Sequence, residues 1–344
     1  MPGFHDLKNI YRDNVSGYVD NRIVVCQVVI TLSHNNLIGT IMDKKICGPM
    51  RPVGWLALFV AIFVANMPGA ESQERFDVSR HGSASEQTII FIPGLGSPGD
   101  VWAETVDTLG HSTDTHIVSV AGFGGVPAIE TAGEGGFIAP LVTELADYID
   151  AHQLEDVTLV GHSLGAQISL QLAATRPEAI TSVLVIDSAP FFARLFNPTV
   201  TPEQAAAYGQ SMGSQMAVLP REQYLGFTRQ GLAVQSMTQE GQARVYGYME
   251  ASDQGSVARA MAEVAGGDFR PVLPGVRADV TVLVAWAEPS PMTAADLLAV
   301  YAEQYAGLAE ATIKIVDGAR HFIMFDQSDV FMAELQIVLR AAEQ

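Results

Sequence analysis

The stretch VGHSLGA, residues 160–166, sets a serine between two glycines where a predicted strand ends and a predicted helix begins. A serine on such a sharp turn needs glycine two residues to either side, here Gly161 and Gly165, because a Cβ would strike the neighbouring backbone. The turn presents the hydroxyl of Ser163 above the edge of a sheet, and the helix N-terminus favours negative charge that develops there. The pattern predicts a nucleophilic serine on a strand–turn–helix unit.

A serine hydroxyl is a weak nucleophile and needs a base within hydrogen-bond reach. The chain has one histidine after Ser163, which is His321, in a loop beyond a predicted strand at 312–316. The order serine, acid, histidine, with the histidine on a late loop, is the order that this kind of turn requires. We therefore expect His321 to be the base, although an isolated histidine is as often an ordinary surface residue. His162 is expected to pack or to hydrogen-bond a loop.

Acyl transfer also needs hydrogen-bond donors for the oxyanion of the tetrahedral intermediate. We expect one donor to be the backbone amide of Leu164, directly after the nucleophile. The second is expected from Leu95, in the loop PGLG at residues 93–96, because glycines there let the backbone approach a substrate. The alternative is a glycine turn that serves only the topology.

From about residue 75 onward, short runs rich in Val and Ile alternate with helix-length segments, as in a mainly parallel sheet flanked by helices. The predicted strands are 88–92, 116–120, 157–160, 182–186, 280–286 and 312–316, with an antiparallel edge strand at 76–80. The predicted helices are 137–151, 164–174 and 330–341. Between 191 and 275 no strand pattern appears, and prolines divide helical stretches rich in Ala, Gln and Met. We expect a helical cap there, inserted between late strands.

These motifs resemble those of the α/β-hydrolase superfamily over residues 75–342. In that family the first loop often begins with His-Gly. Here Pro93 stands in place of the histidine, which leaves the amide of Leu95 available, and Trp102 stands where a loop-packing tryptophan is common. The resemblance implies an α/β-hydrolase fold and a triad of serine, histidine and an acid. Dehalogenases and epoxide hydrolases of the family carry an aspartate as nucleophile, so Ser163 argues against both activities.

Three carboxylates follow predicted strands and are candidates for the acid: Asp187, Glu288 and Asp317. In most family members the acid follows the strand before last, in a segment like W-G-x-x-D, but here residues 286–290 read WAEPS and Ser290 takes the place of the aspartate. A subset of small esterases and thioesterases instead uses a segment like I-D-x-A-P, and residues 186–190, IDSAP, are similar to it. We favour Asp187 as the acid, with Glu288 as the alternative. Asp317 precedes His321 too closely.

Charge and cysteine content exclude several functions. From residue 71 onward acidic residues outnumber basic ones 34 to 13, and the whole chain of 344 residues has a net charge of −19. This balance argues against nucleic acid and peripheral membrane surfaces as partners. Both cysteines, Cys26 and Cys47, precede residue 50, so nothing downstream can be a thiol nucleophile, a disulfide or a zinc–sulfur site. Hydrophobic residues make up 48% of the chain, enough for a globular core.

The N-terminal part reads as a targeting segment. A positive start at Met50 and Arg51 precedes residues 53–65, which are apolar apart from Gly54, and small residues follow, as in a secretory signal peptide. The alternative is a membrane anchor over residues 53–67, although the run is shorter than the roughly 20 residues that span a bilayer. We interpret the chain as three parts: 1–49, a non-native upstream segment or a tail; 50–70, a signal peptide or anchor; and 71–344, a secreted or periplasmic domain.

The expected function is hydrolysis of carboxylic esters of a small-molecule acyl substrate, through an acyl-enzyme on Ser163, with no metal and no organic cofactor. Phe191 and Phe192 are expected to line an apolar acyl pocket, together with methionines of the cap, namely Met212, Met216, Met237 and Met249. For each methionine taken alone, we favour packing between helices as the interpretation. A lactonase, thioesterase or peptidase would share this machinery, whereas a non-catalytic binding relative would have lost a member of the triad.

Overall fold

The computed structural model describes residues 31–33, 36–38, 75–82, 87–111, 113–129 and 136–342. Both cysteines and the predicted targeting segment, residues 50–70, lie outside these residues. The chain divides into two units, Met1–Glu71 and Ser72–Gln344. In the first unit Thr31–Ser33 (β1) and Asn36–Ile38 (β2) form an antiparallel pair, where the sequence shows no sustained strand periodicity.

In the described part of the second unit, seven strands form one sheet in the order β3-β5-β4-β6-β7-β8-β9. The strands are Phe76–His81 (β3), Thr88–Ile92 (β4), Asp114–Val120 (β5), Val157–His162 (β6), Ile180–Ile186 (β7), Asp279–Trp286 (β8) and Ala311–Asp317 (β9). β3 runs antiparallel to β5 at one edge, and the other neighbouring pairs are parallel. The predicted strands are confirmed, and all of them except β4 extend by one or two residues at one or both ends.

Helices cover both faces of the sheet, because successive side chains of a strand point to opposite faces. In β4, Ile89 and Phe91 belong to one apolar layer and Ile90 and Ile92 to the other. The first layer includes side chains of Ala103–Leu109 (α3), Ile323–Asp326 (α11) and Ser328–Ala342 (α12), and the second includes Ile138–Ala151 (α4), Leu164–Thr175 (α5) and Ala294–Gln304 (α10). The predicted helices correspond to α4, α5 and α12, whereas α3 and α10 were not predicted.

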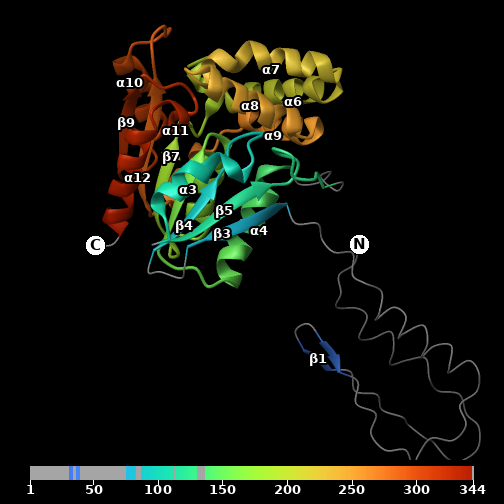
Figure 1. Cartoon of the computed structure of the whole chain (residues 1–344), viewed down its shortest axis with the longest axis vertical. Helices are drawn as coiled ribbons and strands as arrows, with labels where there is room; N and C mark the ends of the chain where they lie inside the picture. The colour runs from blue at the N-terminus through green and yellow to red at the C-terminus, as the bar shows by residue number, and fades with distance from the viewer. Residues whose placement is uncertain are drawn as a thin grey trace, which may run out of the picture. The chain divides into compact units, whose positions relative to one another are not determined.

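Four helices stand between β7 and β8, where the sequence predicts a helical cap. They are Pro202–Val218 (α6), Arg221–Gln235 (α7), Gln239–Ala251 (α8) and Gln254–Gly266 (α9). The side chains of Thr201, Thr238 and Asp253 accept hydrogen bonds from the first turns of α6, α8 and α9, which stabilises these helix starts. The 3-10 turns Phe192–Leu195 (η2) and Arg270–Gly275 (η3) flank the group. Figure 1 shows the four helices gathered beyond one end of the sheet.

The parallel register aligns the carboxyl ends of the central strands. Ile92 of β4 pairs with Gly161 of β6, and Ile186 of β7 pairs with Leu283 of β8. Ser163 and Asp187 are the next residues after β6 and β7, so they start from neighbouring points of one sheet edge. This is the edge at which open α/β sheets bind ligands.

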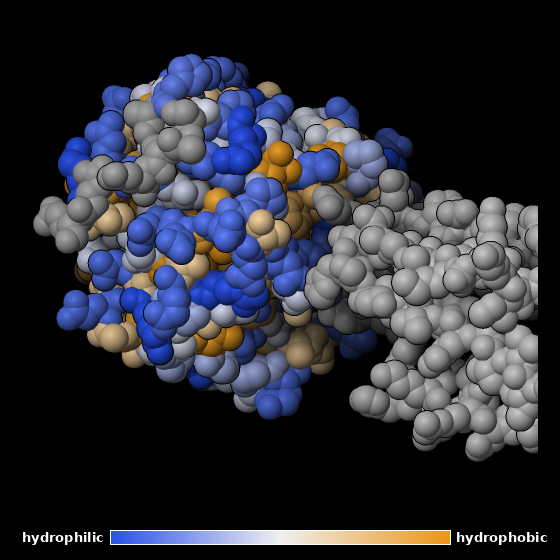
Figure 2. Space-filling model, turned by 90° about the horizontal axis from the view of Figure 1, so that it is seen from below, coloured by the Kyte–Doolittle hydropathy of each residue, from blue (hydrophilic) through white to orange (hydrophobic). Residues whose placement is uncertain are grey.

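None of the helices in the described ranges is both long and apolar enough to cross a bilayer. The face of the molecule seen in Figure 2 carries mostly hydrophilic side chains, with hydrophobic ones in small groups. The large buried hydrophobic side chains lie instead in the two layers on either side of the sheet.

Two glycines allow α5 to begin directly at the end of β6. A Cβ on Gly165 would lie 2.2 Å from the carbonyl oxygen of Ile92, and a Cβ on Gly161 would lie 2.6 Å from the Cα of Ala166. The first turn of α5 therefore lies against the end of β4 at a distance that leaves no space for a side chain at position 165.

We expect Gly165→Ala to destabilise the protein by about 1–3 kcal/mol or more, because α5 must move away from the end of β4 to admit the methyl group. Gly226→Ala on α7 is the matched control, since a Cβ there would meet no atom within 4 Å and alanine favours a helix over glycine by roughly 0.5–1 kcal/mol. Urea unfolding of both variants measures the difference. Equal stability of the two would show that the close approach at Gly165 is not tight.

Candidate active site

Ser163 lies in a strained turn that neighbouring strands hold in place. Its backbone has φ 53° and ψ −117°, in the left-handed region that non-glycine residues rarely adopt. Its amide donates to the carbonyl of Ile186 on β7 at 3.0 Å, and its own carbonyl accepts from the amide of Ala166 at 3.0 Å. These two bonds fix the turn from the sheet side and from the helix side.

Asp187 and His321 are joined by a hydrogen bond. His321 Nδ1 lies 2.7 Å from Asp187 Oδ2, and the other carboxylate oxygen accepts from the amide of Ala285 at 2.9 Å. Asp187 itself has φ 46°, and its amide donates to the carbonyl of Leu283 at 2.8 Å. Because an ionised carboxylate only accepts, Nδ1 carries the proton, and Nε2 of a neutral His321 is left with the lone pair.

The other candidate carboxylates lie elsewhere. Glu288 is exposed, and its Oε2 accepts from the amide of Ser290 at 3.3 Å. Asp317 is exposed at the end of β9. Of the three carboxylates, only Asp187 bonds His321 in the described structure.

His162, the residue before the serine, supports the loop of His321. Its Nε2 donates to the carbonyl of His321 at 3.0 Å, and its ring lies 4.5 Å from the ring of Phe322 between centroids. The side chain is 1% exposed. Burial first, and the neighbouring His321 second, hold the pKa of His162 well below its usual range, although the hydrogen bond to the carbonyl opposes the shift. His162 is therefore a neutral support for the loop.

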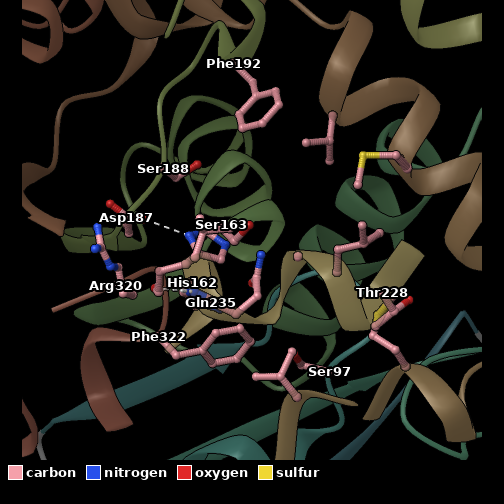
Figure 3. A pocket seen from close by; sticks show the side chains of 18 of the residues that line it. Ser97, His162, Ser163, Asp187, Ser188, Phe192, Thr228, Gln235, Arg320 and Phe322 are labelled. Carbon is pink, nitrogen blue, oxygen red and sulfur yellow. Dashed lines mark hydrogen bonds and ion pairs between the residues drawn. The ribbon is translucent and has the colours of Figure 1, made fainter. Parts of the chain in front are cut away.

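A cavity of about 670 Å³ opens at this edge of the sheet, and Ser163, Asp187 and His321 line it. Its walls are mainly apolar and come largely from the cap, including Leu195, Met212, Met216, Leu219, Leu232 and Val264. Figure 3 shows Ser163, His162 and Asp187 gathered at the cavity, with Phe192 at one end. Within the described residues no hydrogen bond joins Ser163 Oγ to His321, a bond that often tightens only when substrate is bound.

The predicted pocket residues separate into two groups. Phe192 lines the cavity, as do Met212, Met216 and Met249. Phe191 does not: its ring is fully buried, with the guanidinium of Arg270 4.7 Å from its centroid. Met237 is 48% exposed and also lies outside the lining. The expectation that these two residues line the pocket was wrong: Phe191 precedes the turn η2 and packs against Arg270, and Met237 lies in the exposed turn between α7 and α8.

The loop with Leu95 lies against the nucleophile. A Cβ on Gly94 would be 3.2 Å from the Cβ of Ser163, and Leu95 lines the cavity. In the described structure the amides of Leu95 and Leu164 have no protein acceptor, so both are free to bind an oxyanion.

Ser252, between α8 and α9, links this loop to the cap, and no sequence pattern pointed to it. Its hydroxyl lies 3.0 Å from the carbonyl of Gly96 and accepts from the amide of Gly124 at 2.8 Å. These partners are 156 and 128 residues away in the chain, so only the tertiary structure brings them together. In the described ranges no group of three side chains suits a metal ion.

Known proteins similar to this chain agree with its fold. A model of the alpha/beta hydrolase family matches residues 89–334. The pimeloyl-[acyl-carrier protein] methyl ester esterase of Aeromonas hydrophila is 32% identical over 39% of this chain and 50% of its own length. A putative carbamate hydrolase, RutD, of Yersinia enterocolitica is 28% identical over 33% of this chain and 41% of its own length. The match thus spans half or less of these curated relatives.

Among solved structures, MenH from S. aureus superimposes with a TM-score of 0.62. The alignment covers 78% of this chain and 99% of that protein, at 14% sequence identity. At this sequence identity, the similarity shows that the two proteins share an arrangement of helices and strands.

The neutral, buried state of His162 should make the protein less stable in acid. Below about pH 6.5 the unfolded chain protonates this side chain while the folded protein, with its lowered pKa, does not. The contribution of neutral His162 to the free energy of unfolding is therefore fully present above about pH 6.5. It decreases as the pH falls below this value, by at most about 1.4 kcal/mol per pH unit.

We expect His162→Gln, which keeps a donor for the carbonyl of His321, to show a shallower fall in melting temperature between about pH 7 and pH 5. His111→Gln, at an exposed position, should keep the wild-type slope. Thermal melts across this range measure both. If the melting temperature of His162→Gln fell with pH as steeply as that of the wild type, His162 would be protonated in the folded protein.

Proposed function

The chain belongs to the alpha/beta hydrolase family, and on this basis we propose that it is a serine hydrolase of carboxylic esters, with Ser163, His321 and Asp187 as its triad. The observation that carries the proposal is the 2.7 Å hydrogen bond between His321 Nδ1 and Asp187 Oδ2, on the wall of the cavity that Ser163 lines. The strained turn of Ser163 is the second support, since such strain persists only where the surrounding structure enforces it.

The reaction follows from the proton positions. His321 Nε2 takes the proton of Ser163 as Oγ attacks the acyl carbon, and the amides of Leu95 and Leu164 donate to the resulting oxyanion. The tetrahedral intermediate collapses, the alkoxide leaves, and Nε2 returns the proton to it. Water then gives a proton to Nε2 while it attacks the acyl-enzyme, and the carboxylic acid departs as Ser163 regains its hydrogen.

Asp187 orients the histidine in this scheme. Its carboxylate holds the Nδ1 proton, so that Nε2 has the lone pair in the neutral ring, and its negative charge stabilises the imidazolium that forms. The bond from the amide of Ala285 keeps the carboxylate from rotating away. We therefore assign the acid to Asp187 rather than to Glu288.

The substrate class is an ester with an apolar part. The cavity is large enough for a small molecule of drug size, and apolar side chains of the cap form most of its wall. The name of the Aeromonas hydrophila relative, a methyl ester esterase, agrees with this chemistry.

Ser163→Ala should lower kcat by roughly 10³–10⁶ with an unchanged melting temperature, because it removes the nucleophile and little else. Hydrolysis of p-nitrophenyl octanoate, together with labelling by a fluorophosphonate, measures the loss. Ser211→Ala, at an exposed site on α6 outside the cavity, is the control. Wild-type turnover by Ser163→Ala would end the serine-hydrolase proposal, and panels of lactones and thioesters with the same enzyme would show whether the ester is the preferred acyl donor.

Asp187→Asn should lower kcat by about 10⁴, since the amide no longer holds His321 in the required tautomer. Glu288→Gln should leave kcat near the wild-type value, because Glu288 is exposed and bonds the amide of Ser290 instead. Both variants are compared on one ester, with a thermal melt of each to exclude a folding defect. The reverse result would move the acid to Glu288.

A further inference from the structure

The C-terminal end of cap helix α7 is bonded to the loop that carries His321. The amide of Phe322 donates to the carbonyl of Gln235 at 2.9 Å, and the amide of His321 donates to the carbonyl of Val234 at 3.3 Å. These carbonyls belong to the last turn of α7, which has no partner for them within the helix. The end of α7 is thus held beside the histidine by backbone bonds that do not depend on side chains at 234 and 235.

Asp326 fastens the same two segments a second time. Its carboxylate accepts from the hydroxyl of Ser236 at 2.7 Å, from the amide of Met237 at 3.0 Å, and from the amide of Arg320 at 2.9 Å. The donors come from the turn after α7 and from the residue before His321. Since Ser236 is 0% exposed, its bond to Asp326 is shielded from water and helps to fix where the end of α7 lies.

The side chain of Gln235 is presented to the cavity by these bonds. Gln235 lines the cavity together with Ser163 and His321. It is half-buried, and within the described residues its amide group makes no hydrogen bond. Figure 3 shows the side chain extending from the end of α7 toward the part of the cavity where Ser163 lies.

Several other polar side chains of the wall are engaged by the protein, and wall atoms that lack a partner in the described structure, such as Tyr224 Oη and Gln167 Oε1, are fully buried. Gln167 donates to the carbonyl of Ala189 at 3.1 Å, and Gln215 donates to the hydroxyl of Ser211 at 2.9 Å. Thr228 donates to a backbone carbonyl of its own helix, and Arg320 donates to the carbonyls of Ala287 and Pro289. Gln235 therefore has both of its amide functions available for a bound molecule.

We propose that Gln235 is a specificity residue that hydrogen-bonds an oxygen substituent of the substrate close to the scissile ester. The substrate class is an apolar acyl ester that carries a hydroxyl or keto oxygen within about three bonds of the acyl carbon. An amide both donates and accepts, so it pairs with either group. The proposal rests on the proposed function, because it takes the acyl carbon to lie at Ser163.

The position of the oxygen follows from where Gln235 is held. The backbone of Gln235 is bonded to the residue after His321, and Figure 3 shows its side chain on the Ser163 side of the cavity, so we place the oxygen close to the reacting ester. A substituent there that found no partner would leave a polar group unpaired in an apolar wall, which is unfavourable. An unpaired polar group in a mainly apolar cavity selects substrates that can pair with it.

The test compares methyl octanoate with methyl 2-hydroxyoctanoate and methyl 3-hydroxyoctanoate. In the wild type we expect kcat/KM for at least one hydroxylated ester to exceed that for octanoate. Gln235→Met, which keeps the length of the side chain and the backbone bonds of position 235, should reduce this ratio about tenfold. Gln230→Met is the matched control: it makes the same change on α7, at an exposed position outside the cavity, and should keep the wild-type ratio.

A second measurement does not depend on turnover. In the Ser163→Ala protein, calorimetry should give a lower Kd for the preferred hydroxylated ester than for methyl octanoate, and adding Gln235→Met should remove the difference. If the wild type hydrolyses none of the three esters, the proposed function fails, and these Kd values still decide the role of Gln235. The assignment would be overturned if Gln235→Met left both ratios, of kcat/KM and of Kd between the hydroxylated ester and methyl octanoate, unchanged. An equal loss of kcat/KM on all three esters would overturn it too.

Discussion

The site depends on one constraint: α5 begins at Ser163 with no loop between it and β6. The close approach of Gly165 to the end of β4 brings the first turn of α5 onto the sheet edge, and the serine must then adopt φ 53°. The amide bond to Ile186 holds that conformation. Because β7 is the strand beside β6, the same edge delivers Asp187 one residue beyond the strand that supports the serine.

Much of the framework was predictable because its signals are local. Buried parallel strands such as β4 and β7 are short apolar runs, and the elbow at Ser163 has a fixed glycine spacing, so the sheet, α5 and the cap could be read from the residues. Helix α3 is short, and the exposed side of α10 carries alanines and Leu298 as well as Asp296 and Glu303, so neither has a strong periodic pattern. Pairings such as Ser252 with Gly96 are set by tertiary contacts and leave no trace in sequence spacing.

Neighbouring residues can have different environments, and this limited prediction at the pocket. Phe191 and Phe192 are adjacent and chemically identical, yet Phe191 is buried against Arg270 while Phe192 lines the cavity. The direction of each ring is decided by the turn η2 and by its contacts with η3 and α9. Likewise, Asp187 and Glu288 each follow a strand; the segment IDSAP favoured Asp187, and the geometry of the sheet edge is what brings it within 2.7 Å of His321.

The contact of the Ser252 hydroxyl with Gly96 and the hydrogen bond that Ser236 donates to Asp326 attach the cap to both sides of the catalytic edge. A cap attached on both sides cannot swing open as a rigid lid without breaking these contacts. Substrate would then enter through an opening of fixed position. Phe196 and Phe227 line the cavity and are 75% and 61% exposed, so they lie where it meets solvent. With the cap held in place, a substitution at Phe196 or Phe227 alters the opening of the cavity while the catalytic groups keep their positions.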